Sequence, residues 1–189
     1  MALSDVALCS RALIRIGAQP ITSFDDGTAE SEVAGAMFSP ICDALLSSYA
    51  WSFASGQIQL NQLVTSPVAD YQNAFELPSD FLRAISAGAG GHGRGLNFRI
   101  ARSELHTDAR EVVLSYIFRP EEEVFPAYFD AAVIARLAAE FTIPMTESTT
   151  RAEAMFRLAE QEFARARQID AQQDTPGRIE RFTLTDVRG

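Results

Sequence analysis

The spacing of apolar residues changes twice along this chain, and the change limits the folds open to it. Near the N-terminus, apolar residues recur every three or four positions and predict a helix over residues 4–16. In residues 57–120 they alternate or cluster in short runs between turn signals, as strands do. Helical spacing returns after Pro126 and lasts to Gln172. The pattern predicts a mainly α, α+β fold: a four-helix bundle core carrying a small antiparallel β-rich insertion.

Local signals mark where the helices begin and end. Ser4 is a predicted N-cap of the first helix and Gly17 its stop; Thr28 is the predicted cap of the second. Pro40 lies inside the second helix and predicts a kink or a break. The apolar stripe of that helix is predicted at Val33, Ala36, Met37, Ile41, Ala44, Leu45 and Ser48.

The later part of the chain carries two more predicted helices. One follows Pro126 and ends at Ile143-Pro144, with Phe129, Val133, Leu137 and Phe141 on one face. The other is capped by Ser148 or Thr149 and bears the stripe Ala152, Met155, Phe156, Ala159, Phe163 and Ala166. Trp51 and Phe53, directly after the second helix, are predicted core residues.

These patterns divide the 189 residues into three parts. Residues 1–56 and 121–173 form the predicted helical bundle, and residues 57–120 form the β-rich insertion. Within the insertion the clearest strand is 111–119, where Val112, Leu114, Tyr116 and Phe118 face one way. Residues 174–189 form an extended C-terminal arm.

Charge narrows the function classes. The formal net charge is −9, and all 16 basic residues are arginine, which excludes chemistry that needs a lysine, such as a Walker A site or a Schiff base. So acidic a chain repels DNA phosphates and disfavours groove-reading DNA binding. It has no apolar run of about 18 residues and no basic region before an apolar N-terminal stretch, so we expect a soluble protein, intracellular at synthesis. Cys9 and Cys42 are expected to be buried, inert thiols.

The glycine-rich loop 88–95 is the most enzyme-like feature. A phosphate cradle needs such glycines followed by a helix N-terminus, but here a strand-like segment, 96–100, follows. A hairpin tip is therefore the favoured interpretation. Four of its residues, Gly90, Gly91, His92 and Arg94, are candidate contacts with a tail-side protein under the family resemblance given below.

Other candidate catalytic or metal-binding groups are weak. His92 has no ligand partners at metal-binding spacing. Ser103, His106 and Asp108 are close in sequence, but no nucleophile elbow surrounds the serine, so a solvated turn is expected. The run 121–123 of glutamates is expected to be solvated charge at a helix start. We expect no enzymatic activity, no cofactor and no metal.

The C-terminal arm has an unusual composition for a frayed end. It places large apolar residues between arginines, and this favours docking onto a neighbouring subunit or partner over simple fraying. The candidate contact residues are Arg178, Ile179, Arg181, Phe182, Leu184 and Val187.

Four segments, taken in order, resemble the phage head–tail adaptor proteins, a family also called tail tubular protein A. The first, 9–27, has a leucine-rich helix, a Gly-x-x-Pro-Ile turn and an acidic Asp-Gly. The others are 43–54 (Asp-Ala-Leu-Leu to Trp-Ser-Phe-Ala), 75–83 (Phe-Glu-Leu-Pro-Ser-Asp-Phe-Leu-Arg) and 135–146 (Ala-Arg-Leu-Ala-Ala-Glu to Ile-Pro-Met-Thr). The likeness covers about residues 3–172.

The resemblance implies a function as well as the four-helix core with a β-rich insertion. Members form a ring, usually a dodecamer, beneath the portal of a tailed-phage capsid. The ring joins the portal to the tail, nozzle or stopper protein, and double-stranded DNA passes through it without sequence-specific binding. By position, the arm from Arg178 to Val187 would bind the portal, although its residues match no family motif. The protein is then expected in the virion neck, after synthesis in the host cytoplasm.

Two alternatives stay open. One is a small anion- or nucleotide-binding protein or enzyme that uses loop 88–95. The other is a different neck component, such as a tail terminator or stopper, which the helical ends of the chain disfavour because those proteins are typically β-rich.

Overall fold

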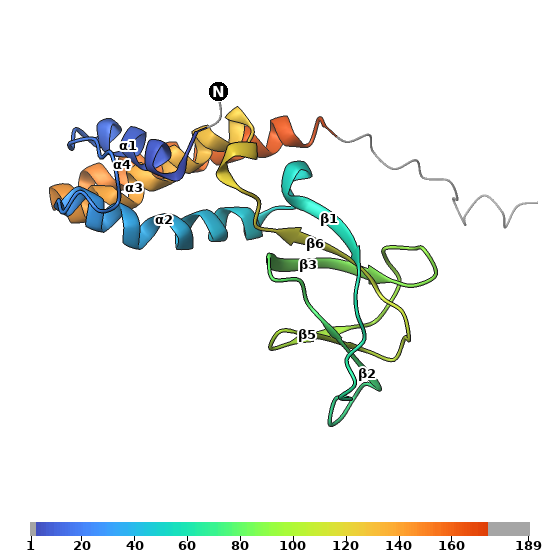
Figure 1. Ribbon diagram of the computed structural model, residues 1–189. Helices are drawn as coiled ribbons and strands as arrows, with labels where there is room; N and C mark the ends of the chain where they lie inside the picture. Colours follow the sequence, from blue (N-terminus) through green and yellow to red (C-terminus); the bar gives the residue numbers. More distant parts are fainter. Residues whose placement is uncertain (1–2, 174–189) are drawn as a thin grey trace, which may run out of the picture.

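A layer of helices carries a β-rich part that projects from one side of it (Figure 1). The structure is a computed structural model and describes residues 3–173. Its helices are α1 (Asp5–Ile16), α2 (Ala29–Ser48), α3 (Ala127–Thr146) and α4 (Thr149–Asp170). Its strands are β1 (Ser55–Gln59), β2 (Asn73–Glu76), β3 (Phe81–Gly88), β4 (Arg99–Ala101), β5 (Glu104–Thr107) and β6 (Val113–Phe118). The predicted α+β class, helical with a β-rich insertion, is confirmed.

The predicted caps form as local chemistry requires. The Ser4 side chain accepts a hydrogen bond from the backbone N–H of Ala7, which lies in the first turn of α1. Gly17 ends α1 in the left-handed region, at φ 78°, where a glycine has no steric cost. Thr28 and Ser31 cap α2 reciprocally, each side chain accepting from the other's backbone N–H.

Two helices continue past prolines at which the sequence predicted an interruption. α2 is one helix through Pro40, so a break there is wrong. α3 likewise passes Pro144 and ends at Thr146, not at the predicted Ile143-Pro144; Glu147 follows in the left-handed region. A proline removes one helical hydrogen bond. Both prolines lie on the exposed side of their helices, where water can take up the freed carbonyl group.

The insertion contains two three-stranded antiparallel sheets. Their strand orders are β1-β6-β3 and β2-β5-β4, and the first sheet lies next to the helices while the second is farther away (Figure 1). Side chains alternate between the two faces of β6. Ile117 joins the core of the helical part, whereas Val112, Leu114 and Tyr116 join the core between the sheets. The first sheet therefore links the two cores, and the predicted common face of Val112, Leu114 and Tyr116 is confirmed.

Strand β5 is absent from the predicted pattern. Its residue His106 was expected in a solvated turn, but it lies in the ladder, paired with Ala74 of β2 and Arg99 of β4. The segment is short and only Leu105 in it is a large apolar residue, fully buried in the insertion core. A single large apolar residue shows no periodicity, so the sequence pattern does not predict a strand here. Pairing with the two neighbouring strands decides the conformation of β5.

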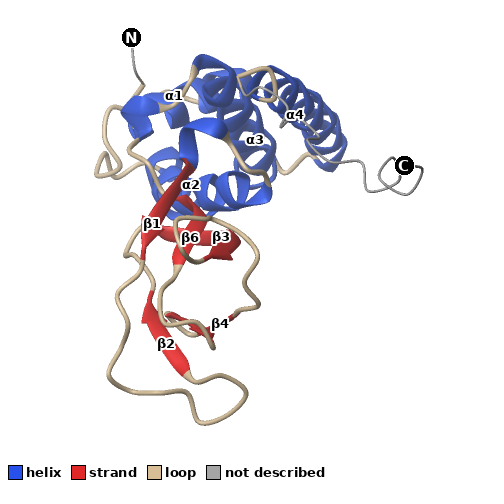
Figure 2. Cartoon of the chain, turned by 90° about the vertical axis from the view of Figure 1, so that its right-hand side faces the viewer, coloured by secondary structure: helices blue, strands red, loops and turns tan. Residues whose placement is uncertain are grey.

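Helix α3 lies at the centre of the helical part. It packs against α1, α2 and α4, while α4 makes its extensive contacts with α3 alone. Viewed nearly along the helices, α1 and α4 lie on opposite sides of α3, with α2 below (Figure 2). Because α2 and α4 do not close against each other, the space between them is open on one flank.

The predicted aromatic core residue Trp51 is fully buried, and Phe53 is partly buried beside it. The Trp51 ring lies 4.9 Å from Phe129 of α3 and 5.6 Å from Phe163 of α4, in edge-to-face contacts. Its indole N–H donates to the carbonyl oxygen of Leu45 at 3.1 Å. Trp51 thus joins the end of α2 to both later helices.

Candidate interaction surfaces

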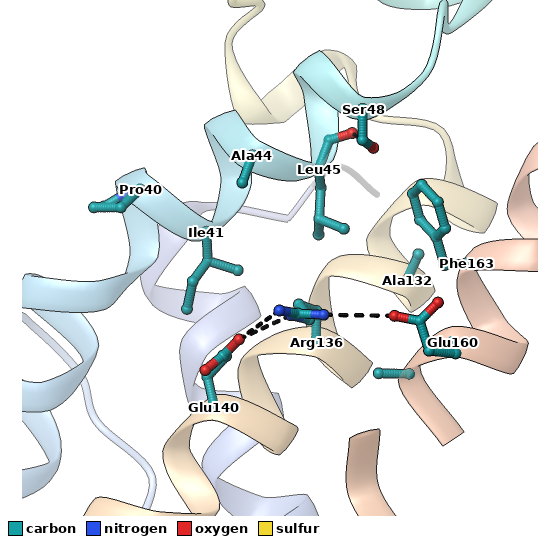
Figure 3. A pocket seen from close by; sticks show the side chains of 11 residues that line it. Pro40, Ile41, Ala44, Leu45, Ser48, Ala132, Arg136, Glu140, Glu160 and Phe163 are labelled. Atoms are coloured by element: carbon teal, nitrogen blue, oxygen red, sulfur yellow. Dashed lines mark hydrogen bonds and ion pairs between the residues drawn. The ribbon is translucent and has the colours of Figure 1, made fainter. Parts of the chain in front are cut away.

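An apolar groove of about 350 Å³ lies between α2 and α4, with α3 as its floor (Figure 3). Ile41 and Leu45 project into it from α2, and Phe163 closes one end from α4 (Figure 3). Small residues line the rest of it and keep it open. They are Ala44 and Ser48 on α2, Ala132 on α3 and Ala159 on α4.

The α2 wall of this groove includes four residues of the predicted apolar stripe, Ile41, Ala44, Leu45 and Ser48. In the structure the fully buried face is a different one, formed by Ser31, Ala34, Phe38, Cys42 and Leu46. Ile41 and Leu45 are only partly buried, and Ala44 and Ser48 are exposed. Val33, Met37, Ile41 and Leu45 of the predicted stripe pack against the edge of the helical core. The apolar face of α2 is wider than the predicted stripe, and helical period alone does not fix its centre.

A chain of charges crosses the groove. The Arg136 guanidinium contacts Glu140 one turn later on α3 at 2.7 Å, and reaches Glu160 of α4 at 3.6 Å (Figure 3). It also lies over the Phe156 ring, 5.1 Å from the ring centre. The Glu160 side chain is 70% exposed. Two carboxylates against one guanidinium leave the groove with a net negative charge and a loosely held acid at its rim.

Loop 88–95 is folded onto the sheet that carries it. The Gly93 carbonyl oxygen accepts hydrogen bonds from the hydroxyls of Ser86, at 2.7 Å, and Ser115, at 3.3 Å. The His92 N–H donates to the carbonyl of Ala89, so this donor is used inside the loop. The loop runs from β3 to β4 and joins the two sheets, and no helix follows it. This geometry favours a structural connection over a cradle of free N–H groups.

The other candidate residues of the loop are open to solvent. Gly90, Gly91, His92 and Arg94 are all exposed. Gly90 and Gly91 have φ of 63° and 82°, and a Cβ on either would meet nothing within 4 Å. These four residues are therefore placed where a partner can contact them. The candidate arm residues, Arg178 to Val187, lie outside the described part of the chain.

Asp170, at the end of α4, gathers three segments that are distant in sequence. Its carboxylate accepts from the backbone N–H of Ser52 at 3.0 Å, from the Ser52 hydroxyl at 2.7 Å and from the Tyr128 hydroxyl at 2.7 Å. Burial and this hydrogen bond raise the pKa of Tyr128 to about 12. The cluster fixes the end of α4 to α3 and to the 3₁₀ turn Ser52–Ala54. The sequence analysis missed it, since no local signal connects residues 118 positions apart.

Arg119 joins the insertion to the helices where the chain leaves β6. Its guanidinium contacts Asp43 of α2 at 2.6 Å and also pairs with Glu122. Its backbone N–H donates to the carbonyl of Asp80 at 2.8 Å. Glu122 is thus part of an ion-pair cluster, which corrects the expectation that all of 121–123 is solvated charge; Glu121 and Glu123 are exposed as expected.

The remaining titratable candidates do not assemble a catalytic site. Cys9 and Cys42 are buried in the helical core, and burial raises the pKa of each thiol to about 12, which keeps them in the unreactive protonated form. His106 Nε2 lies 2.8 Å from Glu104, two residues before it on the same strand. Within residues 3–173 no three His, Cys, Asp or Glu side chains are arranged to hold a metal ion.

Comparisons with known proteins add no family. A scan against protein-family models found none that matches the chain, and a search of curated proteins also found no match. Among the helices of the described region, none is both long and apolar enough to cross a membrane.

Proposed function

We propose that this chain is a structural protein of a tailed-phage neck. Copies form a ring that joins the portal to the tail, nozzle or stopper protein, and the ring continues the DNA channel. The observation that carries the proposal is the set of four segments that resemble the head–tail adaptor family in order. The virion neck is the proposed location, and no enzymatic activity or cofactor is part of the proposal.

Three of those segments contribute to one core, and this supports the proposal because the resemblance then falls on residues that pack together. Segment 9–27 forms most of α1 and the turn after it, where Asp26 accepts from the N–H groups of Thr22 and Ser23. Segment 43–54 supplies Trp51, and segment 135–146 supplies the C-terminal part of α3. The remaining segment, 75–83, connects β2 to β3 in the insertion.

The roles of the surfaces follow from their positions and chemistry. The arm from Arg178 to Val187 is proposed to bind the portal, and the exposed loop residues Gly90, Gly91, His92 and Arg94 to contact the tail-side protein. A formal charge of −9 for each copy gives the ring an acidic wall. Such a wall repels the phosphates of DNA and lets the duplex pass without adhering.

The test is the mass of the purified protein, alone and after mixing with the portal protein of the same phage, by light scattering and electron microscopy. We expect rings on the portal, and a variant that lacks residues 178–189 should keep its helical circular dichroism but lose attachment. A His92→Ala/Arg94→Ala variant is the matched control: it should still bind the portal and lose only tail-side contact. Undiminished attachment of the truncated protein would overturn the role of the arm.

The alternative function is tested on the same samples. An anion- or nucleotide-binding protein would bind inorganic phosphate or ATP saturably as a monomer, with loss in a Gly90→Ala/Gly91→Ala variant. No association with the portal together with saturable binding would replace the neck function by this one.

A further inference from the structure

Within residues 3–173, no segment covers the apolar groove between α2 and α4. A helix with a wide apolar face normally has the whole of that face packed. Phe38 and Cys42 of α2 are buried in the core, whereas Ile41 and Leu45 are only partly buried against it and also border the groove. The groove is therefore complementary to a partner that brings an apolar side chain and positive charge, because two carboxylates, Glu140 and Glu160, face one guanidinium, Arg136.

A surface with that chemistry is present on α1 of the same chain. Ile14 is 58% exposed. Arg11 and Arg15, three residues before it and one after it, are also exposed. One helical turn earlier, Ser10 is small enough to let another helix approach closely. Ile14 with its two arginines is called the α1 patch below.

The patch and the groove lie on opposite sides of α3. α1 packs on one side of α3, and α2 and α4 border the groove on the other (Figure 2). One copy therefore cannot bring its own patch to its own groove, but the next copy can. A contact between two different surfaces is heterologous, and it continues from copy to copy instead of closing as a pair.

We propose that the α1 patch of one copy docks into the α2–α4 groove of the next, with Ile14 against Ile41 and Leu45 and the arginines toward Glu140 and Glu160. The inference deepens the ring assembly proposed above and rests on it. The occupant is a second copy of this chain, because polarity and charge are complementary between two surfaces that every copy carries. One exposed apolar side chain and two arginines make a small contact, so free copies associate weakly and the contact forms where copies are gathered.

Cysteine cross-linking tests the contact without removing the residues that make it. The variant Ser10→Cys/Ser48→Cys places one thiol beside Ile14 and one in the groove, and Cys9 and Cys42 are buried and do not compete. With a short bismaleimide at high protein concentration we expect a ladder of dimers, trimers and longer products. The matched control Ser10→Cys/Ser39→Cys moves the second thiol to an exposed position of α2 outside the groove and should give only background.

Two further variants of the reporter pair test the chemistry. Ile14→Asp removes the apolar anchor and should reduce the ladder about tenfold, the effect of losing roughly 1.4 kcal/mol. Glu160→Arg should reduce it less, and adding Arg15→Glu should restore it, because the swap returns opposite charges to the contact. Circular dichroism checks that each variant is folded.

The proposal fails if the Ser39 control cross-links as well as the Ser48 pair, if products stop at dimers, or if Ile14→Asp leaves the ladder unchanged. Cross-linking on portal-bound protein separates this inference from the neck function. Rings on the portal without Ser10–Ser48 products would retain the neck function and reject this interface. Ladders of cross-linked copies without portal binding would retain this interface and reject the neck function.

Discussion

The helical part and the β insertion build their cores differently. In the helical part, residues from all four helices share one core. Within it the Trp51 ring lies within 6 Å of the ring centres of Tyr49, Phe53, Phe129 and Phe163. The insertion has a smaller core between two three-stranded sheets, with Phe75, Leu105 and Leu114 as its largest fully buried members. Burial scales with stability, so the helical part is the rigid body and the insertion the part that opens first.

A small number of residues connect the two cores. Ile117 of β6 and Leu82 of β3 connect the first sheet to the helices, and Arg119 holds the exit of β6 against α2. Few other links cross this junction in the described residues. The comparison teaches that a change in one core should spread only weakly into the other. Phe75→Ala tests this directly, and three other substitutions probe the helical part.

The largest effect is expected for Trp51→Ala. The change removes a fully buried ring from the centre of the helical core and should lower the free energy of unfolding by about 3–5 kcal/mol. That loss corresponds to a decrease of about 10 °C in Tm, measured by circular dichroism. A Tm within about 2 °C of wild type would show that Trp51 does not hold the helices together.

Phe75→Ala should have a large but confined effect. Phe75 is 1% exposed in the insertion core, so its loss should cost about 3 kcal/mol locally. Hydrogen exchange should accelerate in β1–β6 while α1 and α3 keep their protection. Ile85→Ala, at a 44% exposed position of β3, is the control and should change little. Equal loss of protection in the helices would contradict the separation of the two cores.

Tyr128→Phe sharpens the comparison within the helical part. It removes the hydroxyl that donates to Asp170 at 2.7 Å, and we expect a loss of about 1–2 kcal/mol in chemical denaturation. Tyr49→Phe is the matched control, a partly buried tyrosine beside Trp51 that is not part of the Asp170 cluster. An equal loss at Tyr49 would mean that the cluster does not contribute beyond ordinary packing.

The smallest effect is expected for Asp130→Asn, and it depends on pH. Burial raises the pKa of Asp130 above its usual value, against the opposing charge of Arg11, and its Oδ1 atom has no hydrogen-bond partner. The folded state then binds the proton more tightly than the unfolded state. This stability is complete below the unfolded pKa and is lost as pH rises through the folded pKa.

The variant lacks this titration, so its Tm relative to wild type should rise between pH 4 and pH 7. The exposed control Asp25→Asn should keep a constant difference from wild type over the same range. A parallel pH profile for Asp130→Asn and wild type would contradict the raised pKa.

Much of the helical part could be predicted because its signals are local. Helix caps act within a few residues of themselves, so they can be predicted from neighbours in the chain. The side chains of Ser4, Thr28 and Ser148 accept hydrogen bonds from N–H groups of the first helical turn, and Gly17 ends α1. The period of β6 is equally readable, since alternation over the strand selects one face.

The tertiary structure decided those features for which the local sequence pattern allows more than one outcome. The apolar face of α2 is wide, and packing against α1 and α3 buries Phe38 and Cys42 fully while Ile41 and Leu45 stay partly buried beside the groove. β5 forms because two strands flank it, and Asp170 meets Ser52 because α4 returns along α3. Each outcome depends on contacts between residues that are distant in sequence. A pattern in neighbouring residues gives no information about the energy of such contacts.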